Sequence, residues 1–415
     1  NIVELLLANH PKDCLACSRS GNCELQNIAN NLGIRQIRYE YNRPELPKDE
    51  SNPCLVRDPS KCILCGRCVR MCAEVQGTSI YSFAYRGLNA RVTPAFNLGL
   101  GNVACTFCGQ CRKVCPTAAI TYKSDIDRVR AALNDPEKIV MVQTAPSVRV
   151  AISEPFGGVP GDIATGQMAS ALRRLGFDKV FDTNWSADLT IMEEGSELID
   201  RVKNGGVLPM ITSCSPGWIN FMEINYPELI PHISTAKSPQ SMFGSMLKTY
   251  YAEKQGIDPA KIVSVAIMPC TAKKFEARRP QLAASGYPDT DIVLTTSELA
   301  QMIKEANINF KELPDGKFDP ILSCGSGAGT IFGVTGGVME AAVRTAYKLL
   351  TGTEMEPIEL EAVRGLKGVK EATVDFAGLK LKVAVVSGLA NARMVCESVK
   401  NGNPNGWNFV EIMAC

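Results

Sequence analysis

The sequence has 415 residues, of which 45% are hydrophobic and 21% charged, so it is long enough for two or more domains with ordinary cores. Its 44 Lys and Arg residues nearly balance its 43 Asp and Glu residues, and a net charge of +1 gives no general attraction for nucleic acid or an anionic membrane. No apolar run reaches the roughly 18 residues that a membrane-spanning helix needs. The chain starts at Asn1 rather than Met, and we expect it to be a fragment that lacks both ends of a longer protein.

The 17 cysteines are unevenly distributed, with 12 of them in residues 1–115. Disulfides suit small secreted scaffolds, whereas repeated Cys-x-x-Cys spacings in a large chain are typical of a metal protein in a reducing compartment. The composition therefore predicts a cytoplasmic metalloprotein.

Residues 1–48 are predicted to form a small metal-binding segment. A short helix is expected over residues 2–8, and a polar connector that contains two prolines follows near residues 43–47. Between them, one histidine and three cysteines can close a metal site: His10, Cys14, Cys17 and Cys23. This ligand set is common for structural zinc, so zinc and a 4Fe-4S cluster are both open; the position just before further cluster motifs favours the 4Fe-4S cluster.

Residues 49–124 contain an internal repeat of two four-cysteine runs, each followed by a short apolar stretch. Both runs match the bacterial ferredoxin pattern, in which three thiolates of one run hold a cubane and the fourth ligates the other cubane. Zinc also binds four thiolates, but two complete runs favour iron-sulfur clusters. One predicted cluster takes Cys62, Cys65, Cys68 and Cys115, and the other takes Cys105, Cys108, Cys111 and Cys72. Cys54 is left over and is predicted to be a small buried residue.

Residues 125–415 are predicted to form an α/β domain, because β-rich runs alternate with amphipathic helical patterns. At least two sheets, or two lobes, are expected. Strands are expected over 139–142, 179–181, 208–212, 262–268, 291–295, 381–386 and 409–413. Helices are expected over 163–175, 186–203, 297–305 and 337–351.

Three cysteines of this region follow predicted strands: Cys214, Cys270 and Cys415. The carboxyl ends of strands are where α/β folds build their sites. A single cysteine in such a place is most simply a core residue. Three of them, on three separate strands, predict a shared site.

At these residues the sequence resembles the catalytic subunit of an iron-only (FeFe) hydrogenase of the larger modular kind, over essentially the whole chain. The motifs are Thr212-Ser213-Cys214-Ser215-Pro216, Met268-Pro269-Cys270 with Lys273-Lys274, and Met413-Ala414-Cys415. The resemblance implies an α/β two-lobed hydrogenase large-subunit fold, preceded by an α+β twin 4Fe-4S ferredoxin-like domain and the small histidine-containing segment. It also implies an H cluster, which is a 4Fe-4S cubane bridged to a two-iron unit that carries CO and cyanide.

The resemblance assigns roles to individual residues of this sequence. Cys214 corresponds to the thiol that exchanges protons at the two-iron unit, Cys270 and Cys415 correspond to cubane ligands, and Lys273 corresponds to the lysine that binds a cyanide. The residues that correspond to the lining of the cofactor pocket are Ala145, Pro146, Ser147, Gln240, Met268, Phe332 and Met413, together with the glycine-containing run over 326–333.

A proton path is also implied. Glu194, Glu197 and Arg201 have the spacing i, i+3 and i+7, which places them on one face of a predicted helix, and Ser234 corresponds to a hydroxyl between the two carboxylates. An isolated helix with this pattern would more simply be a solvated face with a salt bridge. Chemistry on protons needs a relay of groups within hydrogen-bond reach, and this requirement favours the path.

Two departures from the family pattern bear on function. Ser215 stands where the family has a cubane-ligating cysteine, and the sequence ends at Cys415, before the cysteine that should bridge to the two-iron unit. Ser215 itself, or Cys324, is a candidate to complete the cluster.

The first hypothesis for function is reversible reduction of protons to H2, within an electron-bifurcating complex linked to NAD(P)H through flavoprotein or ferredoxin partners. The resemblance also allows a 2Fe-2S domain before Asn1. The alternative is a hydrogenase-like subunit that has lost the H cluster and relays electrons in a flavin-containing complex. A hydrogen-sensing relative would be expected to lack the thiol of Cys214.

Overall fold

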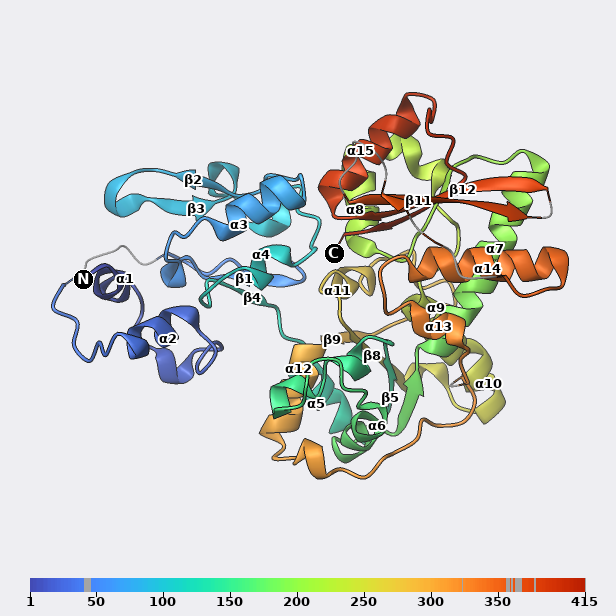
Figure 1. Cartoon of the computed structure of the whole chain (residues 1–415). Coiled ribbons are helices and arrows are strands. Elements are labelled where there is room, and N and C mark those ends of the chain that lie inside the picture. The colour runs from blue at the N-terminus through green and yellow to red at the C-terminus, as the bar shows by residue number, and fades with distance from the viewer. Residues whose placement is uncertain are drawn as a thin grey trace. The chain divides into compact units, whose positions relative to one another are not determined.

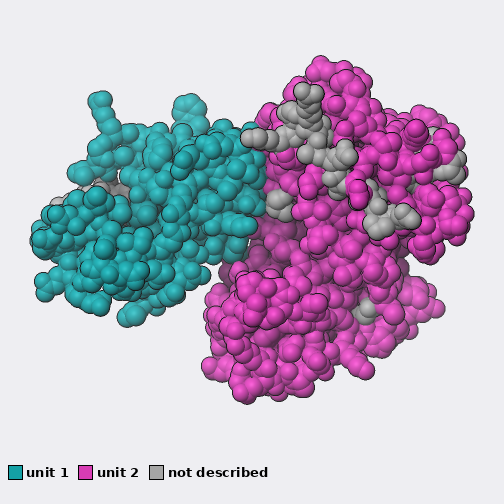
Figure 2. Space-filling view, in the orientation of Figure 1, with its two compact units in different colours: residues 1–123, 415 teal, residues 124–414 magenta. Residues whose placement is uncertain are grey.

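The computed structural model describes residues 1–40, 46–322, 324–355, 359, 361–362, 368–376 and 378–414. It divides the described chain into two compact units, which Figure 2 colours separately: unit 1 comprises residues 1–123, and unit 2 comprises residues 124–414. The predicted connector lies partly outside the described residues. The division of the chain at residues 48 and 124 into three domains stays a prediction.

Unit 1 is made of short elements (Figure 1). Its helices are α1 (Ile2–Ala8), α2 (Glu24–Asn31), α3 (Arg67–Arg70) and α4 (Gln110–Lys113), and its strands are β1 (Leu55–Arg57), β2 (Ser82–Ala84), β3 (Arg91–Thr93) and β4 (Ile120–Tyr122). Strand β1 pairs antiparallel with β4, with Leu55 opposite Tyr122, so the segment that enters the first cysteine run lies beside the segment that leaves the second. Strands β2 and β3 form a separate antiparallel hairpin.

The two cysteine runs adopt the same backbone conformation. Leu64 and Phe107 have φ angles of 56° and 58°, and Gly66 and Gly109 both have a φ of 73°. Each glycine is followed at once by a short helix, α3 or α4. A positive φ is costly for Leu or Phe, so its recurrence at matched positions identifies the repeat as a pair of equivalent loops.

Unit 2 contains a four-stranded parallel sheet in the order β6-β5-β8-β9. Its strands are β5 (Ile139–Thr144), β6 (Lys179–Asp182), β8 (Ile262–Met268) and β9 (Ile292–Thr295). Val140 and Val142 pack into one core with α5 (Ile126–Leu133), α6 (Thr165–Arg174) and α12 (Thr296–Glu305), whereas Met141 packs into a second core with α9 (Pro239–Met246) and the π-helix Leu247–Tyr251. Both faces are therefore covered, as a parallel sheet requires.

A second sheet of unit 2 has the order β10-β11-β12-β13-β7. Its strands are β7 (Met210–Ile211), β10 (Glu361–Ala362), β11 (Val369–Phe376), β12 (Leu379–Ser387) and β13 (Phe409–Met413). The helices of this half are α7 (Asn184–Asn204), α8 (Pro216–Asn225), α14 (Gly337–Thr351) and α15 (Leu389–Lys400), with the short α13 (Gly327–Ile331) against α7. The short α10 (Ala252–Gln255) packs with the first sheet, and α11 (Lys273–Glu276) contacts both β9 and α8. Helices α7 and α14 share a core with β11, β12, β13 and β7. The two sheets confirm the expected two-lobed α/β fold.

The carboxyl ends of the parallel strands carry the residues singled out in the sequence. Strand β5 leads into Ala145, β8 into Cys270, β7 into Cys214 and β13 into Cys415. Since ligands bind in α/β folds beyond these strand ends, the topology provides a site there. Among the described residues, none of the helices has both the length and the apolar character needed to cross a membrane.

Candidate metal centres and active site

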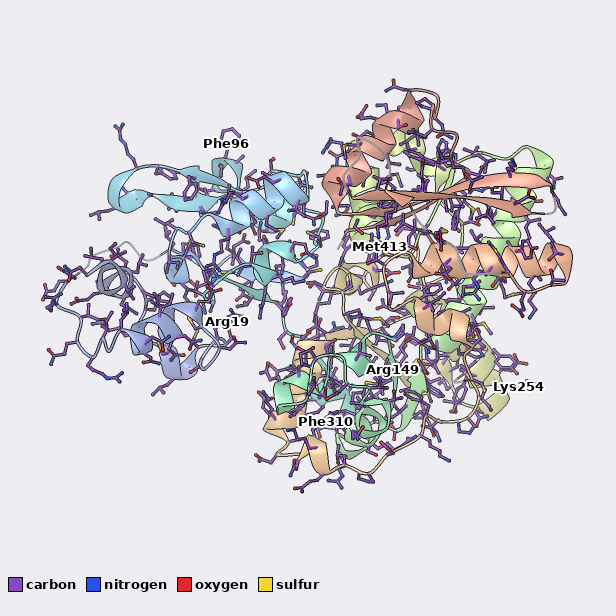
Figure 3. The ribbon with its side chains drawn as sticks, in the orientation of Figure 1. Arg19, Phe96, Arg149, Lys254, Phe310 and Met413 are labelled. Carbon is purple, nitrogen blue, oxygen red and sulfur yellow. The ribbon has the colours of Figure 1, made fainter. Side chains whose placement is uncertain are left out.

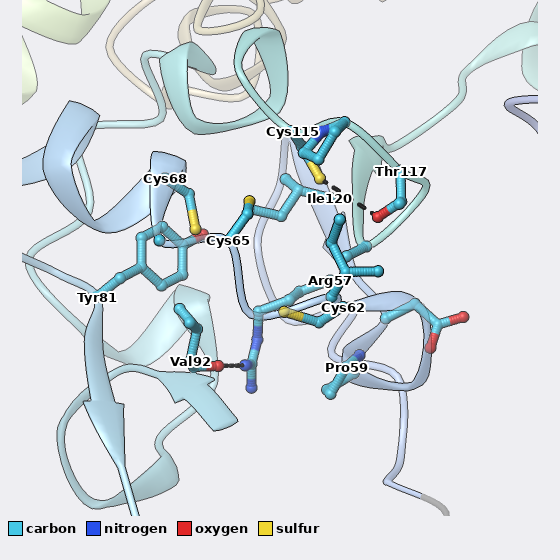
Figure 4. Close-up of a pocket in the computed structure, with 15 residues that line it drawn as sticks. Arg57, Pro59, Cys62, Cys65, Cys68, Tyr81, Val92, Cys115, Thr117 and Ile120 are labelled. Atoms are coloured by element: carbon cyan, nitrogen blue, oxygen red, sulfur yellow. Dashed lines mark hydrogen bonds between the residues drawn. The ribbon is translucent and has the colours of Figure 1, made fainter. Parts of the chain in front are cut away.

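Two cysteine-lined cavities lie in unit 1. The first is lined by Cys62, Cys65, Cys68 and Cys115, with Val92 and Ile120 among its apolar neighbours (Figure 4). The second is lined by Cys72, Cys105, Cys108 and Cys111. Each cavity thus takes three cysteines from one run and the fourth from the other run. This is the crossed arrangement that the ferredoxin spacing predicts.

The sulfur atoms of these cavities are surrounded by hydrogen-bond donors. The backbone N–H of Ile80 lies 3.3 Å from the sulfur of Cys72, the N–H of Leu64 lies 3.5 Å from that of Cys62, and the hydroxyl of Tyr81 lies 3.7 Å from that of Cys111. Such donors stabilise thiolate ligands and tune the potential of an iron-sulfur cluster.

Burial favours the protonated form of several of the cavity thiols. It raises the pKa of Cys68 and of Cys105 to about 12, and raises that of Cys111 well above the ordinary value. A buried thiolate needs a compensating positive charge, which iron supplies. Four cysteines around each otherwise apolar cavity therefore fit an iron-sulfur cluster.

The four predicted ligands of the histidine-containing segment are exposed or half-buried, whereas the cavity cysteines include three that are buried. The Nδ1 of His10 lies 3.0 Å from the carbonyl oxygen of Pro11, and its buried Nε2 has no hydrogen-bond partner among the described residues, as a metal-ligating imidazole would require. Cys14 is exposed, and Cys17 and Cys23 are half-buried. Within the described part of the chain, no three His, Cys, Asp or Glu side chains converge closely enough to hold one metal ion. The ligand set of this segment stays a prediction.

In unit 2, the thiol of Cys214 is buried in the loop between β7 and α8. Burial raises its pKa well above the ordinary value, the carboxylate of Glu194 adds to this effect, and the ammonium group of Lys273 opposes it. Cys214 is therefore a neutral thiol that carries a proton.

Lys273 begins α11, and its ammonium group lies in a buried polar cluster. Its Nζ donates to the hydroxyl of Ser238 over 2.8 Å and lies 2.5 Å from the Oε2 of Glu276, while the hydroxyl of Ser238 donates to the Oε1 of the same carboxylate. The amide nitrogen of Gln240 lies 3.5 Å from the carbonyl oxygen of Lys273, and its buried Oε1 makes no hydrogen bond within the described residues. Ser238 and Glu276 were not foreseen from the sequence, although the i, i+3 spacing of Lys273 and Glu276 is a usable signal.

The predicted proton path lies on α7. Glu194 is fully buried, and neither of its carboxylate oxygens has a hydrogen-bond partner among the described residues. Burial raises its pKa to about 8; the charge of Glu197 also raises it, whereas the nearby Ser213 N–H and Ser234 hydroxyl act in the opposite direction. A buried carboxyl with this pKa can hold or release a proton near neutral pH.

Glu197 lies one turn further along α7. Its Oε2 accepts a hydrogen bond from the hydroxyl of Ser234 over 2.8 Å, and its Oε1 lies 2.6 Å from the Nη2 of Arg201. The N–H of Thr235 also donates to the carboxylate, over 2.9 Å. Glu197 also lines a surface hollow with Glu193, Ser196, Asp200 and Lys237. The alternative to a proton path is a solvent-exposed helix face with a salt bridge. The salt bridge is present between Glu197 and Arg201, but the face is not fully exposed to solvent, because Glu194 is buried.

Most of the predicted pocket-lining residues lie at strand ends, whereas Gln240 lies in α9. Ala145, Pro146 and Ser147 follow β5, Met268 ends β8, and Met413, labelled in Figure 3, ends β13. Phe332 follows α13, and Cys270 is half-buried after β8. Cys415 lies outside the described residues, so its predicted role as a ligand stays a prediction.

The glycine-containing run packs directly on the first turns of α7. A Cβ at Gly329 would overlap the carbonyl oxygen of Asn184. The hydroxyl of Ser326 donates to Asp188 over 2.7 Å, and the amide of Asn184 donates to Thr330 over 3.0 Å. Helix α7 therefore carries the pocket wall at its start and the predicted proton path further along.

Ser215 is buried at the N-cap of α8, and its hydroxyl oxygen accepts a hydrogen bond from the N–H of Ala414 over 3.2 Å. The loop after β7 is thus tied to the end of β13. Nearby on β13, the buried carboxylate of Glu411 accepts the N–H groups of Gly336 and Met339 over 3.0 and 2.8 Å, and burial raises its pKa. Glu411 was also not foreseen, since a glutamate inside an apolar strand gives no functional pattern.

Comparison with known families accounts for this architecture. Residues 138–415 match the iron only hydrogenase large subunit, C-terminal domain. The chain belongs to the iron-only (FeFe) hydrogenase large-subunit family. Residues 61–119 of this hydrogenase-family chain match a 4Fe-4S dicluster domain, and residues 1–38 match the NADH-ubiquinone oxidoreductase-G iron-sulfur binding region.

Named relatives of this hydrogenase family agree. The chain is 49% identical over 420 residues to NADP-reducing hydrogenase subunit HndD of Solidesulfovibrio fructosivorans, and 45% identical over 427 residues to iron hydrogenase 1 of Clostridium pasteurianum; in both cases the match covers 100% of this chain and 72% of the relative. A solved structure of a variant of the FeFe hydrogenase HydA1 of Chlamydomonas reinhardtii matches with a TM-score of 0.62 and 45% identity over 69% of this chain and 81% of its own. These matches confirm the resemblance, the fold and the hydrogenase class that the sequence predicts.

Proposed function

We propose that this chain catalyses the reversible reduction of protons to H2 at an H cluster in unit 2, with electrons supplied through three 4Fe-4S clusters in unit 1. The observation that carries the proposal is the pairing of two buried, protonated groups, Cys214 and Glu194, with a hydrogen-bonded Ser234–Glu197 pair that opens onto the surface. If the only role of this helix face were the Glu197–Arg201 salt bridge, the burial of Glu194 near the thiol of Cys214 would have no explanation.

In unit 1, the two crossed cavities would hold one cluster each. The third cluster would bind His10, Cys14, Cys17 and Cys23. Replacement of one thiolate by a neutral imidazole removes a negative charge from the iron, so this cluster should have a higher potential than an all-cysteine cluster.

In unit 2, the residues at the strand ends fit an H cluster. Cys270 and Cys415 would ligate its cubane, and the buried ammonium group of Lys273, fixed by Ser238 and Glu276, would donate a hydrogen bond to an anionic ligand of the two-iron unit. When bound, this cofactor supplies the redox chemistry on protons and H2. The buried Oε1 of Gln240 has no hydrogen-bond partner in the described part of the chain, which is consistent with a polar group bound in this pocket.

The residues of the chain move the proton. The thiol of Cys214 would give a proton at its Sγ and recover one from Glu194, whose pKa of about 8 keeps the carboxyl protonated at neutral pH. Ser234 would pass the proton between Glu194 and Glu197, and Arg201 holds the Glu197 carboxylate at the surface hollow.

The proposal is tested by anaerobic expression of the full protein together with the enzymes that mature the cofactor. We expect infrared bands of CO and cyanide, and H2 production from reduced methyl viologen. Absence of both would contradict the proposal, because methyl viologen needs no protein partner.

One observation favours a second candidate function, in which the chain is an electron-relay subunit without an H cluster. Ser215 stands at a position where the family has a cysteine, and its hydroxyl is already occupied by the N–H of Ala414. This candidate predicts about 12 iron atoms per chain, whereas a chain with an H cluster binds about six more. Iron analysis therefore separates the two. If Cys324 completes the cubane instead of Ser215, Cys324→Ala will lower the iron content.

The partners proposed are a ferredoxin or a flavoprotein subunit that exchanges electrons with NAD(P)H. The similarity to a protein named as an NADP-reducing hydrogenase subunit supports an assembly of several subunits. A cytoplasmic location is part of the same proposal.

A further inference from the structure

The β2–β3 hairpin of unit 1 and the turn after it expose a group of large apolar side chains, which we call the hairpin face. Its members are exposed to 94% at Phe96, 66% at Leu88, 58% at Tyr85, 56% at Phe83 and 44% at Leu98. Figure 3 labels Phe96 on this side of unit 1. Single apolar residues are common on surfaces, but five within residues 83–98 form a patch of the kind that binds another protein.

The hairpin face is held in a costly conformation. Tyr85 and Phe96 have φ angles of 63° and 55°, in the left-handed region that aromatic residues rarely adopt. The Tyr85 ring is fixed by the guanidinium group of Arg91, 4.3 Å from the ring centre, and its hydroxyl accepts a hydrogen bond from Asn97. The Tyr85 ring is therefore positioned at the surface by specific contacts, which limits the entropy lost when a partner binds.

The same hairpin covers the first cysteine cavity. Val92 of β3 lines this cavity, and its carbonyl oxygen accepts a hydrogen bond from the guanidinium group of Arg57 over 2.7 Å (Figure 4). The ring of Phe83 lies against the Cys65–Gly66 loop, since a Cβ at Gly66 would be 3.2 Å from it. The exposed face and the cavity are thus two sides of one thin layer of protein. An electron carrier bound here would be close to a cluster in that cavity.

The charge of this region indicates the kind of carrier. Between residues 62 and 104, four arginines stand against a single acidic residue, Glu74. Arg67 is paired with Glu24, whereas Arg86 is exposed at the end of β2. An apolar centre with arginines beside it complements a partner whose own apolar patch is bordered by carboxylates.

We infer that the hairpin face is the docking surface for an acidic electron-carrier protein, which exchanges electrons with the cluster bound by Cys62, Cys65, Cys68 and Cys115. This inference rests on the proposed function, because it requires a 4Fe-4S cluster in that cavity. In each transfer one electron passes between the carrier and this cluster, so one centre is oxidised as the other is reduced.

The test uses the matured full protein and a purified acidic ferredoxin kept reduced by dithionite. Phe96→Ser and Arg86→Glu should each raise the KM for this ferredoxin about tenfold, the size expected for an interface anchor. H2 production from reduced methyl viologen should change less than twofold, since this small carrier needs no docking surface. The matched controls are Leu32→Ser, an exposed apolar residue of the same unit, and Arg35→Glu, an exposed arginine of the same unit.

An unchanged KM in both hairpin variants, or an equal rise in the controls, would overturn the inference. A change of oligomeric state on gel filtration in the variants would overturn it as well, because the face would then join two copies of this chain. If the unmodified protein shows neither 4Fe-4S signals nor methyl viologen activity, the proposed function has failed; if it shows both and only the docking effect is missing, the inference alone has failed.

Discussion

The cysteine cavities of unit 1 and the Cys214 pocket of unit 2 both depend on buried thiols, but they are assembled differently. The eight cavity cysteines come from two equivalent loops that share a backbone conformation. The groups around Cys214 come from α7, α11 and the segments after β7 and before α9, and they are joined by side-chain hydrogen bonds. A metal site with regular spacing can be recognised from sequence, whereas a proton path exists only when distant segments meet.

The largest expected effect concerns Cys214. If this thiol transfers protons, Cys214→Ala will reduce H2 production by about 10²- to 10⁴-fold, the range for loss of a general acid or base. Cys396 in α15 is the matched control, since it too is a buried thiol whose pKa is raised, to about 12. Cys396→Ala should keep its activity per H cluster, as measured by infrared spectroscopy and H2 release. An equal loss in both variants would mean that burial, rather than proton transfer, makes Cys214 important.

The second prediction concerns Glu194. Glu194→Gln removes the buried acid and should lower H2 production by about 10²-fold, whereas Glu193→Gln, its exposed neighbour on α7, should have little effect. Comparable rates in the two variants would remove Glu194 from the path.

Glu194 also makes stability depend on pH. Below about pH 4.5 its carboxyl is protonated in both the folded and the unfolded chain, and up to about pH 8 only the folded chain retains the proton. The free energy of unfolding therefore falls as the pH rises through this window. Glu194→Gln should nearly match the wild type at pH 4.5 and exceed it at pH 8, by on the order of 4 kcal/mol in chemical unfolding. A stability difference that does not vary with pH would contradict the burial of a titrating carboxyl.

A third prediction tests the crossed cavities. Cys115→Ser should disturb the cluster held by Cys62, Cys65 and Cys68, although Cys115 belongs to the other run. Cys72→Ser should instead disturb the second cluster. Electron paramagnetic resonance of the reduced protein should show a different altered signal in each variant. If both variants alter the same signal, the fourth ligands are not exchanged between the runs.

The smallest effect is expected at the start of α7. Gly329→Ala should lower the free energy of unfolding by about 1–3 kcal/mol, because its Cβ would overlap the carbonyl of Asn184. Gly327→Ala, in the same short helix α13, meets nothing within 4 Å and should be neutral. Equal thermal stability of the two variants would show that the glycine-containing run does not pack tightly on α7.

Regular patterns in the sequence predicted much of the fold correctly. The helices over 2–8 and 337–351 and the strands over 262–268 and 409–413 agree with the structure to the residue, because each is a continuous amphipathic or apolar segment. The hairpin β2–β3 was missed, since strands of three residues show no alternation. Helices α8 and α9 were missed as well, because both begin at proline and are buried on most sides, which leaves no polar face to mark their period.

For the site, cysteine spacing predicted which thiols would line each cavity, and helical spacing brought Glu194 to the same helix as Glu197 and Arg201. Ser238, Glu276 and Glu411 were missed because their importance comes from hydrogen bonds to remote segments, which a single sequence does not record.

The number of residues between Asp188 and Glu194 in helix α7 fixes how the pocket wall and the carboxylates are oriented relative to each other. The glycine-containing run rests on Asn184 and Asp188, whereas Glu194 and Glu197 lie two to three turns later. Removal of one residue between Asp188 and Glu194 would turn the second half of the helix by about 100° and shift it by about 1.5 Å against the first half. The pocket wall and the carboxylates would then no longer face the same interior. An insertion or deletion between Asp188 and Glu194 would therefore disturb both parts of the site, whichever residue is added or removed.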